Sequence, residues 1–155
     1  MCMCLTIVVP GPPQGKGRAR TVKRGNFVHS YTPEKTVLYE NLIKTLAIEE
    51  MKKKEIDMMT GAVNIWIRAY FEIPKSTSKK RREEMINFDI LPCKKPDLDN
   101  IAKTVADALN GIVYNDDSQI CEISMTKVYG EKPLLIICVD EIGDLDRTKG
   151  VCEGH

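Results

Sequence analysis

This 155-residue sequence has few histidines, no regularly spaced cysteine motif and no acidic residue near its N-terminus. The only histidines are His29 and His155, so a histidine metal site or a histidine general base is not expected. The six cysteines include no Cys-x-x-Cys pair and no regular framework, which argues against a zinc site and a disulfide scaffold. Cys121 and Cys138 fall in apolar, strand-like runs, so we expect buried free thiols.

We expect no leader peptide in the first residues. Residues 1–9 are apolar over too short a stretch for a signal peptide, and they lack the charged residues with which one begins. We therefore expect a strand there and a cytoplasmic protein with no membrane partner. The chain length corresponds to one domain. We expect a single domain over residues 1–142 and a flexible C-terminal tail over residues 143–155.

Two well-known binding motifs are excluded by their missing residues. The run 15–18, Gly-Lys-Gly-Arg, begins like a dinucleotide-binding fingerprint, but Arg20 stands where the third glycine belongs, and no Walker sequence follows. An EF-hand loop beginning at Asp97 would place Ala102 at the glycine position and Ala108 at the position of the bidentate glutamate. Neither a nucleotide-binding fold nor an EF-hand is supported.

The charges are segregated, although the net charge is only +1. Residues 1–33 contain no Asp or Glu, and their basic residues crowd a Gly-rich loop that we interpret as a cationic arm: Lys16, Arg18, Arg20, Lys23 and Arg24. A second basic cluster follows a predicted strand: Lys79, Lys80, Arg81 and Arg82. A charge run by itself is usually a solvated face. Beside an acidic block, however, such segregation is typical of a phosphate-binding surface around a metal centre.

Hydrophobic periodicity predicts seven elements. We expect strands over residues 3–9, 63–73, 119–129 and 134–139, and helices over residues 32–54, 77–86 and 97–112, with a hairpin joining the last two strands. The first helix should turn inward Leu38, Tyr39, Leu42, Ile43 and Leu46. Trp66 and Tyr70 share a strand face, for which the core is the default and a dimer contact the alternative. The fold class is α+β, a two-layer sandwich of a mixed β-sheet with helices packed on one face.

The most informative block runs from residue 97 to residue 118. The apolar residues of the predicted helix over 97–112 form one stripe, which leaves Asp99, Lys103 and Asp107 on the opposite face. Asp97 stands at the N-terminal edge of that helix. A carboxylate pair at a helix start with a lysine one turn on suits a hard metal, because Mg²⁺ takes oxygen ligands and usually needs only one or two carboxylates plus substrate phosphate.

Each of these residues also has a simpler explanation. Asp97 is a good N-cap, and Asp99 with Lys103 is an ordinary i, i+4 pair on a helix surface. Asp116 and Asp117 belong to a favourable turn sequence, and Asp107 is more readily structural than catalytic. The aromatic residues near the basic arm, Phe27, His29 and Tyr31, are minority candidates for stacking on bases.

The pattern Lys-Pro-Asp-Leu-Asp-Asn-x-x-Lys over 95–103, followed by Asp-Ala-Leu-Asn-Gly and by Tyr-x-Asp-Asp-Ser-Gln-Ile over 114–120, resembles the RusA-type Holliday junction resolvases of phages and prophages. Residues 12–20, Pro-Pro-Gln-Gly-Lys-Gly-Arg-Ala-Arg, are similar to the Gly-Lys-x-Arg loop of the phage-type members. The resemblance extends over most of the chain up to about residue 141.

The resemblance implies a dimeric endodeoxyribonuclease that binds branched DNA, above all the four-way junction, and cuts it by paired symmetric nicks in recombination and repair. It implies Mg²⁺ as the cofactor, with Mn²⁺ as a substitute, held by Asp97, Asp99 and Asp117, with Lys103 as the fourth catalytic residue. Asp116 remains the alternative to Asp117. The two basic clusters, Lys16, Arg18 and Arg20 and then Lys79, Lys80, Arg81 and Arg82, would bind DNA. The alternatives are a metal nuclease for flaps or other branched DNA and a non-catalytic DNA-binding module of the same fold.

Overall fold

The computed structural model describes residues 4–143; the expected tail over 143–155 lies outside them except for Gly143. The described chain forms, in order, β1 (Leu5–Pro10), β2 (Arg20–Arg24), β3 (Phe27–Tyr31), α1 (Glu34–Lys54), β4 (Val63–Glu72), α2 (Lys79–Ile86), α3 (Leu98–Leu109), a single 3₁₀ turn η1 (Asp117–Gln119), β5 (Ile120–Gly130) and β6 (Leu134–Glu141). The predicted elements are all present, and one hairpin, β2–β3, was not predicted.

Four of the strands form a mixed sheet in the order β1-β6-β4-β5. β4 is parallel to β5 and antiparallel to β6, and β6 is antiparallel to β1. In this register Ile65 of β4 lies between Val139 of β6 and Ile123 of β5. The α+β class and the mixed sheet are therefore confirmed.

The expected hairpin between the last two strands was wrong, because β4 lies between β5 and β6. The turn over residues 131–133 instead carries the chain past the end of β4, where the amide of Ile73 donates a hydrogen bond to the carbonyl of Gly130. β4 alternates buried and half-buried residues over nearly its whole length. A central position satisfies the backbone hydrogen bonds of such a strand on both edges.

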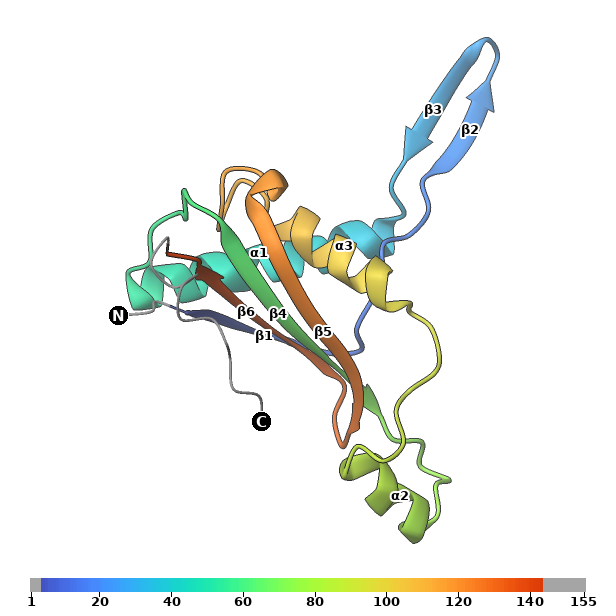
Figure 1. The fold of residues 1–155 in the computed structure, drawn as a ribbon. Coiled ribbons are helices and arrows are strands. Elements are labelled where there is room, and N and C mark those ends of the chain that lie inside the picture. Colours follow the sequence, from blue (N-terminus) through green and yellow to red (C-terminus); the bar gives the residue numbers. More distant parts are fainter. Residues whose placement is uncertain (1–3, 144–155) are drawn as a thin grey trace.

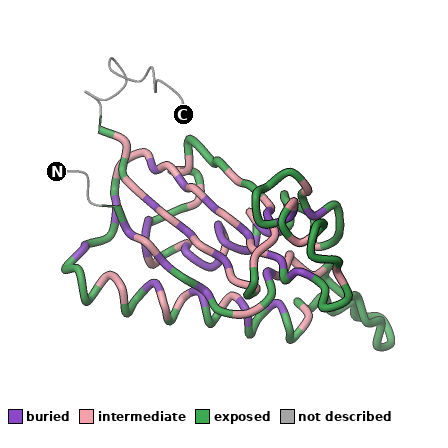
Figure 2. The backbone as a smooth tube through the Cα atoms, turned by 90° about the horizontal axis from the view of Figure 1, so that it is seen from below, coloured by how far each residue is buried: buried purple, intermediate pink, exposed green. Residues whose placement is uncertain are grey.

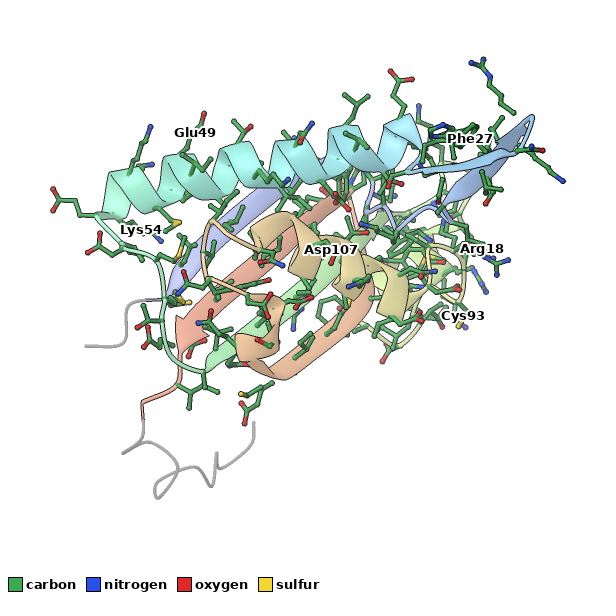
Figure 3. All side chains as sticks on the ribbon, turned by 90° about the horizontal axis from the view of Figure 1, so that it is seen from above. Arg18, Phe27, Glu49, Lys54, Cys93 and Asp107 are labelled. Atoms are coloured by element: carbon green, nitrogen blue, oxygen red, sulfur yellow. The ribbon has the colours of Figure 1, made fainter. Side chains whose placement is uncertain are left out.

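Helices α1 and α3 lie side by side across one face of the sheet, as seen from above in Figure 3. The core between these two layers is built from β-strand residues such as Ile7, Ile65 and Ile137 together with Ile101 and Leu109 of α3. α2 lies beyond one end of the sheet, next to β5 (Figure 1). The helical layer thus leaves one end of α3, its N-terminus, close to the loop that arrives from α2.

Two expectations about burial were wrong. Leu38 and Leu42 of α1 are exposed by 62% and 37%, whereas Tyr39 and Ile43 are buried as expected together with Thr36 and Ala47. Trp66 and Tyr70 are half-buried and alternate with the core residues of β4, so they lie on the open face of the sheet. There the guanidinium of Arg68 lies 5.0 Å from the centre of the Trp66 ring.

Strands β2 and β3 form a separate two-stranded hairpin that projects away from the sheet (Figure 1). It occupies the stretch that we expected to be a basic loop. Every residue of the two strands is exposed, as the colouring of the hairpin in Figure 2 shows. Gly25 has a positive φ of 61° in the turn between the strands, a conformation that glycine adopts without steric cost. The short Gly25-Asn26 turn is the sequence signal that could have identified the hairpin.

The cysteines and the hydropathy of the helices bear on two further expectations. Cys4, Cys93, Cys121 and Cys138 are free thiols, but the expected burial was wrong, because Cys121 is exposed and Cys138 is only half-buried. Among the described helices, none is long and apolar enough to cross a membrane.

Candidate active site

Helix α3 is the platform of the site. Its apolar stripe is buried against the core, and its residues Ile101, Val105 and Leu109 are fully or almost fully inaccessible. Burial of such side chains contributes roughly 1.5–3 kcal/mol each, so the helix is firmly held. The opposite face carries Asp99, Lys103 and Asp107 at intervals of four residues, as the periodicity predicts.

The two acids at the start of α3 have free carboxylates in the described part of the chain. Asp97 is the N-cap residue, but its side chain makes no capping hydrogen bond. Asp99 forms no ion pair with Lys103 or with any other described cation. Neither simpler explanation is therefore observed: Asp97 does not cap the helix through its side chain, and Asp99 does not pair with Lys103. Both carboxylates are exposed and lack a partner among the described residues.

Lys103 lies between two other acids. Its Nζ is 2.9 Å from Asp107 Oδ1, one turn further along α3, and 3.9 Å from Asp117 Oδ2. The hydrogen bond from Lys103 to Asp107 raises the pKa of the ammonium, and the nearby Asp117 carboxylate adds to the effect. Lys103 is consequently held as a cation beside Asp117.

The chain after α3 turns back on the helix and so brings Asp117 to Lys103. The buried hydroxyl of Tyr114 donates a hydrogen bond of 2.7 Å to the carbonyl of Ala106, and the amide of Gly111 donates to the carbonyl of Tyr114. Gly111 has a positive φ of 76°, which the tight return requires. The strand β5 then starts directly after η1, so Asp117 stands at the junction of helix and sheet.

Gln119 fixes the turn that carries the two acids. Its amide nitrogen donates to the carbonyls of Met59 and Gly61, and its amide oxygen accepts from the backbone of Asp116. The Asp116 carboxylate in turn accepts from the amide of Ser118, which completes a capping box. Hydrogen bonds from the hydroxyl and then from the backbone amide of Ser118 lower the pKa of Asp116. Asp116 is therefore engaged within the turn, whereas the Asp117 side chain faces Lys103.

A segment from the N-terminal part of the chain, residues 14–18, crosses the site as a strap. The amide of Lys16 donates to the carbonyl of Asn100 on α3, and the amide of Gly17 donates to Thr36 Oγ1 on α1. The strap approaches closely because of its glycines: a Cβ on Gly15 would lie 2.9 Å from the Cβ of Asn100. The glycines at these positions are explained by this close approach.

Lys16 joins the strap to both helices through its ammonium group. Its Nζ lies 2.6 Å from Glu40 Oε1 on α1 and 2.7 Å from Asp107 Oδ2 on α3. Burial lowers the pKa of Lys16, but the hydrogen bonds to Asp107 and Glu40 outweigh burial and raise it overall. Burial likewise raises the pKa of Asp107, and hydrogen bonds from Lys16 and Lys103 lower it overall. Asp107, labelled on α3 in Figure 3, thus bridges two lysines.

The predicted DNA-binding residues are distributed on two sides of this site. A hollow of about 720 Å³ runs beside the strap, and its lining includes Asp97 together with the cations Lys16, Arg18, Arg20, Lys35 and Lys95. Lys79, Lys80, Arg81 and Arg82 form the first turn of α2, at the opposite end of the molecule from the hairpin (Figure 1). Four cations at a helix N-terminus oppose the helix dipole, so they are unfavourable for α2 itself.

The carboxylates around α3 fit a divalent cation only in part. Within residues 4–143, no three His, Cys, Asp or Glu side chains are gathered into a ready-made metal site. The donor chemistry nevertheless suits a hard cation such as Mg²⁺, which needs only one or two carboxylates when water and substrate phosphate complete its coordination. The candidate oxygen donors are Asp97 and Asp99 at the start of α3, whose carboxylates are free in the described part of the chain, and Asp117 beside Lys103.

Comparison with known protein families shows to which family the chain belongs. The family model described as Endodeoxyribonuclease RusA matches residues 10–140, which include the strap, α3, the Asp116-Asp117 turn, β4, β5 and nearly all of β6. The chain belongs to the RusA endodeoxyribonuclease family. It is thus an endonuclease of the kind that acts on branched DNA junctions, and nucleases of this kind are generally dependent on a divalent metal.

A relative of this chain is the protein of Bacillus subtilis (strain 168) named "Uncharacterized protein YqaN". The two sequences are 33% identical over 141 residues, which cover 90% of this chain and 97% of the relative. The similarity therefore extends over nearly the full length of both proteins.

Proposed function

We propose that this protein is a Mg²⁺-dependent Holliday junction resolvase that cuts four-way DNA junctions by paired symmetric nicks in recombination and repair. The observation that carries the proposal is the placement of Lys103 Nζ 3.9 Å from Asp117 Oδ2, on the helix whose start presents the free carboxylates of Asp97 and Asp99. The proposal is supported by this arrangement along one helix: two free acids at the start of α3, and Lys103 with Asp117 about one turn further on.

The residues of the site divide into three tasks in this mechanism: metal binding, charge stabilisation and positioning. Asp97, Asp99 and Asp117 would hold Mg²⁺, with Mn²⁺ as a substitute, and the bound metal would supply activated water and charge neutralisation at the scissile phosphate. Lys103 would stabilise the charge that develops on the phosphate oxygens, because its ammonium is a compact point charge. Asp107 and Lys16 would position Lys103 through the two ion pairs that Asp107 makes.

The basic residues would dock the DNA on both sides of the acids. Arg18 and Arg20 line the hollow that contains Asp97, and the α2 cluster, Lys79, Lys80, Arg81 and Arg82, lies toward the other end of the molecule. Arg82 pairs with Glu131 at 3.6 Å, and contacts with phosphates would offset the unfavourable placement of the other three cations at the N-terminus of α2. The proposal therefore places one DNA arm along the hairpin side and another along α2.

Two matched nicks require two active sites. A four-way junction has near two-fold symmetry, so a symmetric homodimer that presents one site to each cut strand is the simplest assembly. The expected homodimer is thus part of the proposal, and its stoichiometry can be measured directly by analytical ultracentrifugation.

The decisive experiment incubates the purified protein with a synthetic four-way junction in Mg²⁺, in Mn²⁺ and in EDTA. We expect paired nicks at symmetric positions with either metal and none with EDTA. Parallel reactions use a flap, a three-way junction and a linear duplex. Faster cutting of the flap would favour a metal nuclease for other branched DNA. Tight junction binding without cutting under any metal would favour a non-catalytic DNA-binding module of the same fold.

A further inference from the structure

The hairpin β2–β3 has two chemically different faces. Cross-strand partners lie on the same side of a two-stranded ribbon, and the side alternates along each strand. The pairs Lys23 with Val28 and Thr21 with Ser30 form one face. The other pairs form what we call the aromatic face, which is built from Arg20 and Tyr31, Val22 and His29, and Arg24 and Phe27.

The aromatic face is exposed although half of its residues carry rings. Phe27, labelled on the hairpin in Figure 3, is 74% exposed, and Tyr31 is 48% exposed. Val22, Arg24 and His29 surround a hollow of about 270 Å³ on this face. A two-stranded hairpin has little stability of its own in water, and exposed aromatic rings add an unfavourable contact with water. Both features indicate that the hairpin acts against a binding partner.

The charge of the hairpin indicates which partner. The two strands and their turn carry Arg20, Lys23 and Arg24, and residues 1–33 include no acidic residue. A partner must therefore bring negative charge and flat apolar surfaces together. DNA with unstacked bases offers both, since phosphates pair with arginine and each base presents a π-face to an aromatic ring.

The aromatic face is continuous with the active-site hollow. Arg20 lines the hollow that contains Asp97, and the same residue is the cross-strand partner of Tyr31 at the base of the hairpin. A strand whose phosphate lies at Asp97 could pass Arg18 and Arg20 and reach the rings of the hairpin. The geometry therefore relates the hairpin to the strand that enters the site.

We infer that the aromatic face of the hairpin binds unstacked nucleotides of single-stranded or branch-point DNA, with Phe27 and Tyr31 stacking on bases and Arg20 and Arg24 on the adjacent phosphates. The inference deepens the proposed function, on which it rests for the identity of the DNA. It assigns to the hairpin the recognition of open, branched structure, in addition to the sequence-independent attraction of its charges. A second copy of the chain is the competing occupant, and its basic hairpin would repel this one.

The test compares substitutions on the two faces. Phe27→Ala removes a ring from the aromatic face, and Val28→Ala is the matched control, because Val28 is 64% exposed on the other face. Affinities are measured in EDTA for a single-stranded oligonucleotide, a four-way junction and a linear duplex. We expect Phe27→Ala to weaken binding of the first two DNAs by about tenfold. Val28→Ala should change the affinity for every DNA by no more than about twofold, and neither variant should change the affinity for the duplex by more than that.

A fluorescent base supplies a direct readout of stacking. With 2-aminopurine at the branch point, binding of the unsubstituted protein should change the fluorescence, and Phe27→Ala should abolish the change at saturating protein while Val28→Ala retains it. Arg24→Gln should reduce the slope of log affinity against log salt for single strands by about 0.7. Lys23→Gln on the other face should leave that slope unaltered.

Three results would overturn the inference. If Phe27→Ala and Val28→Ala weakened DNA binding equally, the aromatic face would have no special part in binding. If Phe27→Ala weakened binding of the linear duplex as much as binding of the single strand and the junction, recognition of unstacked bases would be excluded. Conversion of a dimer to a monomer by Phe27→Ala, measured by sedimentation without DNA, would assign the face to a second copy. None of these results depends on cleavage. Absence of nicking by the unsubstituted protein in Mg²⁺ would instead overturn the proposed function and leave the binding comparison intact.

Discussion

Lys16 Nζ lies 2.7 Å from Asp107 Oδ2, although the two residues are 91 positions apart in the sequence. This ion pair connects the strap to the helix that carries Asp99 and Lys103, and Lys103 is bonded to the other oxygen of the same Asp107 carboxylate. The sequence suggested Lys16 as a phosphate contact. Its two carboxylate partners favour a positioning role, and the assignment of Lys16 to DNA binding stays a prediction.

Lys16→Gln should therefore lower the nicking rate itself. Loss of both ion pairs leaves Glu40 and Asp107 without this cation and loosens Lys103, so we expect a roughly tenfold slower rate at saturating protein and a decrease of about 1–2 kcal/mol in the free energy of unfolding. Single-turnover kinetics and thermal unfolding measure the two effects. Arg18→Gln is the control, because Arg18 is exposed: it should reduce the salt slope of binding by about 0.9 and leave the saturated rate unchanged. Identical behaviour of the two variants would contradict the positioning role.

Asp99→Asn should abolish cleavage while junction binding survives or tightens. The substitution replaces a ligand carboxylate with a neutral amide and also removes negative charge that faces phosphate. Binding is measured by gel shift in EDTA and cleavage in Mg²⁺, with Asp89→Asn, an exposed acid before α3, as the control. Undiminished nicking by the pure Asp99→Asn protein would exclude Asp99 as a ligand.

Asp117→Asn and Asp116→Asn should differ sharply. Asp117 faces Lys103, so its substitution should remove activity. Asp116 caps the turn through Ser118, and an asparagine caps a helical turn about as well as an aspartate. Cleavage assays of both variants decide which acid is the ligand, and the reverse ranking would assign the role to Asp116.

Lys103→Ala should reduce turnover by about a hundredfold with little loss of junction affinity, since one lysine among many phosphate contacts adds little to binding but acts in the transition state. Measurement of kcat and KM separates the two effects. If affinity fell as far as the rate, Lys103 would be a docking residue.

Gln119→Leu should slow cleavage without any change at the acids themselves. The substitution leaves the carbonyls of Met59 and Gly61 and the amide of Asp116 without their partner, which should destabilise the protein by about 1–3 kcal/mol and let the Asp117 turn move. Ser118→Ala is a control within the same turn, since it removes only the hydroxyl bond to Asp116 and retains both the backbone amide that Asp116 binds and the contacts of Gln119. A Gln119→Leu protein with the activity of the unsubstituted chain would show that the turn is held by other contacts.

Local patterns in the sequence were sufficient for most elements of the fold. The 3.6-residue period of α3 identified both its buried stripe and its polar face, and the alternation of residues 63–73 identified β4. In α1 the apolar residues form two adjacent stripes, one through Leu38 and Leu42 and one through Tyr39 and Ile43. Packing against β1 and α3 decided that the second is buried.

The order of strands could not be read from local patterns. β5 and β6 are consecutive and joined by a short turn, so a hairpin was the natural prediction. The pairing of β4 with both of them is a property of the assembled sheet, because the backbone groups on both edges of the central strand must be satisfied.

By itself, the sequence identified the helix that carries Asp99 and Lys103, the polar face of that helix and the places where the cations are concentrated, because these properties follow from residue type and local periodicity. The catalytic roles of the acids and of Lys103 came from the resemblance to the RusA-type resolvases, and they stay predictions. Only the tertiary structure decided that Asp117 and not Asp116 faces Lys103, that Lys16 is bonded to Asp107, and that the arm is a hairpin with one aromatic face. These relationships join segments that are distant in sequence, and they arise when burial of the core fixes α3, the strap and the sheet in one arrangement.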